Sequence, residues 1–209
     1  SKFRETVEER AQEIAARTQE KRELQGITLT FLDPQIDPDR IRYSHLLLKL
    51  DRNKGCVDFH IQSPNQKLPE SIEELHQMGD QYWLLALGRE LDDAILHLSF
   101  NEPELGTWVF HTEGNLSSVV DYEQFLIDQS DDWLAREIIL FLKRVLKRID
   151  LSARSLISLM EPGSCFAGFL LELVLASDRS YMLEGSFEDS EEPAPEISPS
   201  SMNFGSLPM

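Results

Sequence analysis

The sequence predicts an α/β fold in which helices cover a largely parallel sheet. Short runs rich in aliphatic, β-branched and aromatic residues alternate with longer runs whose apolar residues recur at helical spacing. This alternation requires right-handed crossovers between parallel strands. The 209 residues, 41% of them hydrophobic, are enough for one sizeable core.

The first 42 residues are predicted to form an amino-terminal helix and a linker. Residues 5–24 place a narrow apolar stripe on an otherwise charged helix. Residues 32–42 contain two Asp-Pro pairs, which are typical of irregular chain. The main domain is therefore expected to begin at Tyr43 and to cover residues 43–209.

The main domain is predicted to begin with a β-hairpin and two helices. Residues 44–51 and 55–62 are strand-like and are separated by a polar turn that ends at Gly55. Residues 70–79 and 82–98 have helical patterns, and the second is amphipathic and suited to packing on a sheet.

The following elements alternate between strand and helix. The long amphipathic helix has acidic residues at its start and basic residues near its end, which suits the helix dipole. We expect strands at 105–112, 154–160 and 179–183, and helices at 131–149 and 167–176.

The carboxyl-terminal part is predicted to be irregular. Residues 185–201 are rich in Ser, Glu and Pro and are expected to form a mobile acidic loop. The chain stops at NFGSLPM as though cut inside an element, so the domain is expected to be truncated at its carboxyl end.

Composition argues against several classes of protein. The 37 acidic and 20 basic residues give a net charge of -17, which would repel nucleic acid. No apolar run approaches the ~20 residues of a membrane span, and the charged start does not resemble a signal peptide. Two cysteines are too few for a disulfide scaffold, so a cytoplasmic protein without membrane contact is expected.

Familiar catalytic and metal-binding patterns are mostly absent. The five histidines have no metal-ligand spacing, so no metal site is expected. Gly163 and Gly168 have P-loop spacing but lack the following Lys-Ser/Thr. Cys165 is interpreted as a packed thiol rather than a nucleophile. His111 could be a base, although a hydrogen-bonded structural role is favoured.

The stretch EPGSCFAGFLLEL, residues 161–173, joins a predicted strand to an apolar helix. Free N–H groups at a helix start can stabilise negative charge on an oxygen. Because the carboxyl ends of parallel strands meet in one crevice, the loop at Gly114 and Asn115 could bring a second N–H to the same point. Two converging donors of this kind stabilise an enolate.

Glu172 is a carboxylate inside the apolar run AGFLLELVLA. Burying a carboxylate is costly unless it has a partner or a function. Two readings stay open, a functional acid/base group and a polar helix edge.

Four strings of the sequence, in this order, resemble members of the crotonase (enoyl-CoA hydratase/isomerase) superfamily. More narrowly, they resemble the carboxyl-terminal half of its ring-cleaving lyases of aerobic benzoate degradation. The resemblance implies a crotonase-like ββα spiral. The strings are RELDDAIL (89–96), ELGTWVFHTEGN (104–115), EPGSCFAGFLLELVLASDRSYML (161–183) and NFGSLPM (203–209).

The resemblance also implies roles for individual residues. The amide of Gly114 or Asn115, with Gly168 and Phe169 at the helix start, would form an oxyanion hole for a thioester oxygen, and Glu172 would be the catalytic acid/base. The chain departs from the superfamily pattern in two places. The usual three glycines are replaced by Gly168-Phe169-Leu170, and Ser201 stands where a second glutamate is expected.

The function implied is that of a CoA-thioester lyase. It would open the ring of 2,3-dihydro-2,3-dihydroxybenzoyl-CoA through an enolate and release formate. Coenzyme A would be part of the acyl-CoA substrate, and no separate cofactor is expected. The alternative is a non-catalytic crotonase-like domain that stabilises a catalytic partner. We expect a homo-oligomer or association with an amino-terminal crotonase-like half.

Overall fold

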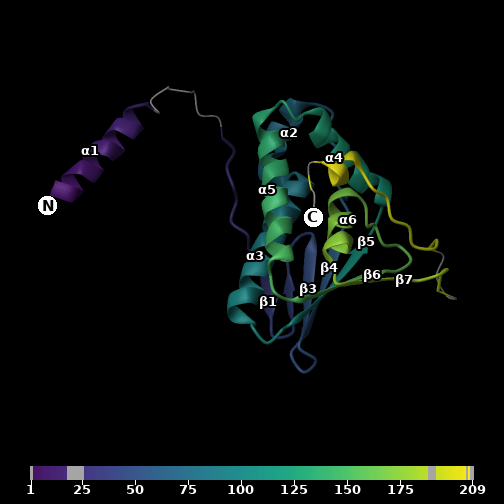
Figure 1. The fold of residues 1–209 in the computed structure, drawn as a ribbon. Helices are drawn as coiled ribbons and strands as arrows, with labels where there is room; N and C mark the ends of the chain where they lie inside the picture. The colour runs from purple at the N-terminus through teal and green to yellow at the C-terminus, as the bar shows by residue number, and fades with distance from the viewer. Residues whose placement is uncertain (1, 18–25, 188–191, 206, 208–209) are drawn as a thin grey trace.

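A single mixed sheet organises the fold in the computed structural model, which describes residues 2–17, 26–187, 192–205 and 207 (Figure 1). Within these residues, seven strands lie side by side in the order in which they occur along the chain. They are β1 (Gln35–Asp37), β2 (Arg40–Arg42), β3 (Leu46–Asp51), β4 (Cys56–Gln62), β5 (Thr107–Glu113), β6 (Ser155–Met160) and β7 (Arg179–Met182).

The sheet is antiparallel on one side and parallel on the other. The pairs from β1 to β4 are antiparallel, and the pairs from β4 to β7 are parallel. The predicted α/β class and the predicted hairpin, now β3 and β4, are confirmed. The sheet is less parallel than expected, because the connections from β1 to β4 are too short for a parallel crossover.

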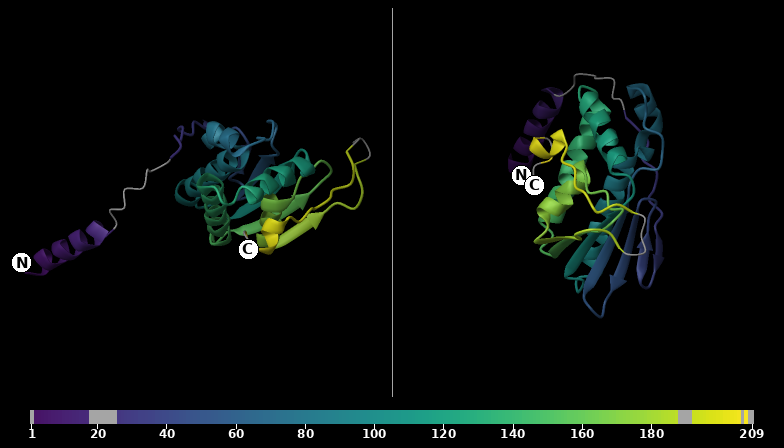
Figure 2. Two further views of the ribbon diagram at one scale, coloured as in Figure 1. Left: turned by 90° about the horizontal axis from the view of Figure 1, so that it is seen from above. Right: turned by 90° about the vertical axis from the view of Figure 1, so that its right-hand side faces the viewer.

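Helices fill the connections after β4 and gather on one side of the sheet (Figure 2). In the described part of the chain, no helix is long and apolar enough to cross a membrane. The helices are α1 (Lys2–Arg17), α2 (Ile72–Met78), α3 (Trp83–Asn101), α4 (Leu116–Asp128), α5 (Trp133–Asp150) and α6 (Gly168–Ala176), with 3-10 turns η1 (Gly79–Gln81) and η2 (Ser201–Phe204).

The two faces of the sheet differ because side chains alternate along each strand. Phe59, Trp108 and Phe110 are fully buried on the covered face, with the Phe59 ring 5.4 Å from Trp108 and 5.0 Å from Phe110. His60 and His111, one position further along their strands, are only partly buried and lie on the opposite face. The core therefore lies between the sheet and the helices, and the second face is more open.

Helix α4 and strands β1 and β2 were not predicted. Asn115 begins α4 by accepting a hydrogen bond from the Ser118 amide, which is an ordinary N-cap. The Asp-Pro region predicted as a linker pairs with β3 through β2, so the sheet begins at Gln35, before the expected boundary at Tyr43. The predicted helix over 5–24 ends at Arg17, and residues 18–25 lie outside the described residues.

The end of the predicted acidic loop is attached to the fold. Ser198 forms a bridge with Ala167, just before α6, and its amide donates to the Phe166 carbonyl. Ser200 then caps η2, which packs on α6. Residues 188–191 of the predicted loop, and residues 206, 208 and 209 of NFGSLPM, lie outside the described residues.

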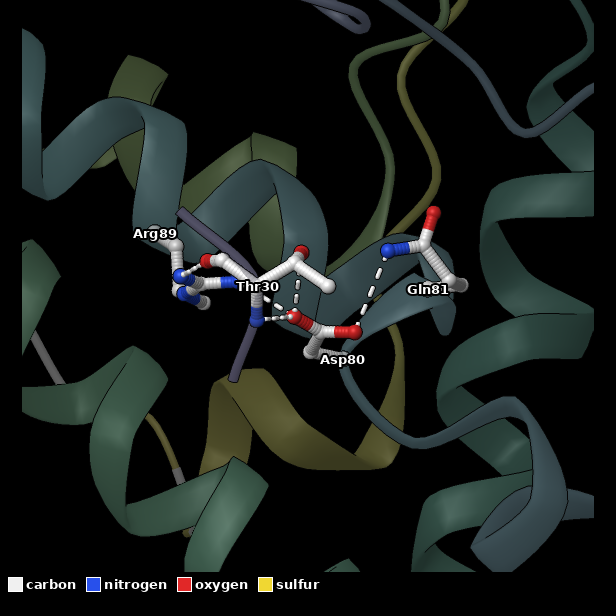
Figure 3. A network of polar contacts seen from close by, with 4 residues as sticks. All are labelled: Thr30, Asp80, Gln81 and Arg89. Atoms are coloured by element: carbon white, nitrogen blue, oxygen red, sulfur yellow. Dashed lines mark hydrogen bonds and ion pairs between the residues drawn. The ribbon is translucent and has the colours of Figure 1, made fainter. Parts of the chain in front are cut away.

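The charged residues of RELDDAIL tie α3 to the preceding chain. Arg89 binds the Asp80 carboxylate at 2.8 Å and also donates to the Thr30 carbonyl (Figure 3). The amide and hydroxyl of Thr30 both donate to Asp80, at 2.5 and 2.7 Å. The next residue, Glu90, accepts hydrogen bonds from the amides of Ser44 and His45. The motif thus anchors both residue 30 and the turn before β3.

Replacing Asp80 with alanine should lower the free energy of unfolding by about 2–4 kcal/mol. Asp80 is only 5% exposed, and its loss leaves the Arg89 guanidinium and the Thr30 amide without their acceptor. Urea unfolding measures the change. Lys54→Ala, which breaks the exposed pair with Asp51, is the control and should cost less than about 1 kcal/mol. Equal losses in the two variants would contradict the anchoring role.

Candidate functional site

The carboxyl ends of β4, β5 and β6 border a pocket of about 490 Å³. This is the edge of a parallel sheet at which ligands usually bind. The predicted residues Gly114 and Asn115 line it, and the predicted residues of α6 do not. The lining residues are His60, Ile61, Gln62, His111, Thr112, Glu113, Gly114, Asn115, Glu161, Pro162, Gly163 and Glu192.

The amides of Gly114 and Asn115 already have acceptors in the protein. Gly114 donates to the Gly163 carbonyl at 3.0 Å, and Asn115 donates to the Ser63 hydroxyl at 3.0 Å. Gly114 has a φ of +127°, and a Cβ at this position would collide with Ser63. Glycine is therefore needed because the loop packs tightly against Ser63.

The amides at the start of α6 are occupied as well. Gly168 donates to the Ser198 carbonyl at 3.1 Å, and Phe169 donates to the Glu123 carboxylate. Gly168 has a φ of +47°, and a Cβ there would collide with the same carboxylate. Glu123 thus takes the place that an external anion would have at this helix terminus.

The two predicted amide groups do not face a common oxygen atom. Asn115 lies at the start of α4, and Glu123 lies about two turns further along the same helix. The Asn115 amide is directed to Ser63, whereas the Phe169 amide is directed to Glu123. In this arrangement, an oxyanion hole made from both loops would require the chain to release its own acceptors.

Glu172 is fully buried, so it does not belong to a polar edge of the helix. The Asn203 side chain donates to one Glu172 oxygen at 2.5 Å and to the Gly168 carbonyl at 2.8 Å. Asn203 belongs to η2, which lies against α6. Glu172 therefore helps to hold the carboxyl-terminal segment on α6.

Glu123 is the functional candidate that sequence reasoning missed. Burial raises its pKa to about 7, and the charge of Glu172 acts in the same direction, whereas hydrogen bonds from Ser200 and Phe169 oppose the shift. The sequence does contain a pattern that points to Glu123. The apolar residues Val119, Tyr122 and Leu126 recur at helical spacing, and Glu123 lies among them on the buried side of α4. An α4 prediction would have placed this carboxyl on the core face.

Two other interpretations from the sequence are settled by contacts. His111 faces Glu161 through Nδ1 at 3.3 Å and Asp58 through Nε2 at 3.4 Å, as expected for a hydrogen-bonded histidine. Cys165 is buried, and burial raises its pKa to about 11, which agrees with a packed thiol. Among the described residues, no cluster of three or more His, Cys, Asp or Glu side chains could hold a metal ion.

Glu123→Gln should flatten the dependence of stability on pH. The Glu123 pKa is raised by burial, so its contribution is fully present below pH ~4.5 and is lost as the pH rises through about 7. At pH 8, the variant should be more stable than the wild type by on the order of 3 kcal/mol. Glu90, whose pKa burial also raises to about 7, is unchanged and preserves part of the slope.

Urea unfolding at several pH values between 4 and 8 tests this expectation. Glu104→Gln changes an exposed glutamate and serves as the matched control, with a curve like that of the wild type. If the free energy of unfolding of Glu123→Gln changed with pH as steeply as that of the wild type, the Glu123 carboxyl would not titrate in this range.

Comparison with known proteins agrees with the resemblance seen in the motifs. The chain is 38% identical over 207 residues to benzoyl-CoA-dihydrodiol lyase of Aromatoleum evansii. The match covers 99% of this chain and 36% of that protein, so the chain spans about a third of its relative. No family model matches the chain.

One solved structure has a partly similar arrangement. An enoyl-CoA hydratase of Geobacillus kaustophilus HTA426 aligns with 79% of this chain and 53% of its own, at 15% identity and a TM-score of 0.48. The sequence relationship is therefore the more informative finding. Nearly the whole chain is therefore related to benzoyl-CoA-dihydrodiol lyase, but it corresponds to only about a third of that protein's length.

Proposed function

We propose that this chain is a section of a carbon–carbon lyase that acts on a CoA thioester in benzoate degradation. The observation that supports the proposal is the 38% identity that extends over 99% of the chain. Identity spread over so much of the chain is more specific than a likeness of fold, since one fold serves many reactions. The substrate would be 2,3-dihydro-2,3-dihydroxybenzoyl-CoA, opened with release of formate.

In this proposal, the thioester oxygen carries the negative charge of an enolate, and backbone amides stabilise it. Phe169 is the amide at the start of α6 that would serve, together with that of Gly114 or Asn115. Binding would require Glu123 to leave the Phe169 amide, because a carboxylate now accepts that hydrogen bond. Glu172, four residues after Gly168, would be the acid/base group.

The second candidate function is a non-catalytic section that stabilises a catalytic partner. The occupied amides of Gly114, Asn115, Gly168 and Phe169 favour it, because none is free to receive a thioester oxygen. The bond from Asn203 to Glu172 also suits a structural role. The partner would be an amino-terminal crotonase-like half, and ring cleavage would take place there.

The proposal predicts that formate release from the dihydrodiol thioester depends on Glu172. The assay is run on the chain alone and on the chain combined with the amino-terminal part of the lyase. Glu172→Gln should lower the rate by ~10²-fold or more if the carboxyl transfers a proton. The amide can still accept from Asn203, so the melting temperature should change little.

The two candidate functions give different results. Unchanged formate release in Glu172→Gln would remove the catalytic role from this section and favour the stabilising role. Calorimetry with the acyl-CoA adds a second criterion, because a purely structural section should not bind the thioester alone. Size-exclusion chromatography of the mixture reports whether the two sections associate and whether this chain self-associates.

A further inference from the structure

Two histidine rings are stacked on the open face of the sheet, beside the pocket at the strand ends. His60 of β4 is paired in register with His111 of the parallel strand β5. Their ring centroids are 4.7 Å apart, and the ring planes differ by 10°. Both side chains line the 490 Å³ pocket. The pair lies on the face opposite the one that carries Phe59 and Phe110.

His111 is held in place from both sides. Its Nδ1 faces Glu161 at 3.3 Å and its Nε2 faces Asp58 at 3.4 Å. A ring with a carboxylate at each nitrogen cannot rotate without losing one of these contacts. His111 therefore offers a fixed surface against which the His60 ring is stacked.

His60 is in a different situation. Among the described residues, no hydrogen bond to its ring nitrogens is found, although the side chain borders the pocket. Burial is the main cause that lowers the His60 pKa, and the charges of His111 and Lys49 act in the same direction. Asp58 and Glu161 oppose the shift. At neutral pH, His60 is thus an uncharged imidazole with a ring nitrogen able to accept a proton.

The charge of the pocket restricts what it can bind. Glu113, Glu161 and Glu192 line it, so a phosphate group of coenzyme A would be repelled there. A neutral group with hydroxyls would fit, because carboxylates and imidazoles accept and donate hydrogen bonds. The acyl end of a dihydroxylated thioester has this chemistry, and its coenzyme A part does not.

We propose that His60 is a general-base residue for a hydroxyl of the acyl group, and that His111 is the residue that positions it. This inference rests on the proposed function, to which it adds a base outside the Glu172 region. The hydroxyl O–H bond breaks, the proton forms an N–H bond on the free nitrogen of His60, and the electron pair stays on oxygen. The imidazolium returns the proton later in the cycle.

Steady-state kinetics of formate release provides the first test. It uses the chain alone or combined with the amino-terminal part of the lyase, whichever releases formate. His60→Gln should lower kcat by ~10²-fold or more with little effect on KM. His111→Asn should have a smaller effect on kcat and should move the acidic limb of the pH profile, because it changes the surroundings of His60. His97→Asn, in the α3 helix, is the matched control and should resemble the wild type.

A second test does not depend on turnover. Ring signals of the histidines are followed by NMR while the dihydrodiol thioester, benzoyl-CoA or coenzyme A alone is added to the chain. The His60 and His111 signals should shift with the dihydrodiol thioester, and not with coenzyme A alone. Signals of His97 should stay constant.

The outcomes separate this inference from the proposed function. Wild-type kcat in a folded His60→Gln variant, with an active wild type, would overturn the role of His60 and leave the lyase proposal standing. An inactive wild type under all conditions would instead overturn the lyase proposal. In that case, histidine signals that do not respond to the dihydrodiol thioester would overturn the binding site as well.

Discussion

The Glu123 carboxylate at the start of α6 is the contact on which the arrangement of the site depends. Burying a carboxylate costs free energy unless hydrogen bonds and opposite charge offset the cost. Here the Phe169 amide and the positive end of the α6 dipole offset only part of this cost, because burial still raises the Glu123 pKa to about 7. The contact joins α4 to α6, and Glu172 joins α6 to η2 through Asn203. Three segments distant in sequence are thus held around two buried carboxyl groups.

The titratable groups of the site lie in two separate places. Glu123 and Glu172 lie among the helices, whereas His60 and His111 lie on the more open face beside the pocket. A strand carries alternate side chains on opposite faces, so the two histidines point away from the helices, and the pocket beside them opens at the carboxyl ends of the strands. This separation explains why Gly114 and Asn115 border a cavity, while Phe169 and Glu172 lie in the closed part of the molecule.

The sequence was sufficient for elements whose pattern is local. Helices α3 and α5 and the hairpin of β3 and β4 have strong periodicity or a clear turn, and all were predicted. Helix α4 was missed because it begins directly after a strand end that had been read as a loop. The acceptors of the Gly114 and Phe169 amides could not be predicted, since each comes from a segment about 50 residues away in the chain.

The order of the strands has a consequence for how the chain acquires its structure. Every strand from β2 to β7 pairs with the strand immediately before it in the sequence. A sheet with this order can grow at one edge as the polypeptide leaves the ribosome, without waiting for a later segment to insert between earlier ones. Among the described strands β7 would pair last, and until it does, the edge at β6 carries unpaired backbone groups.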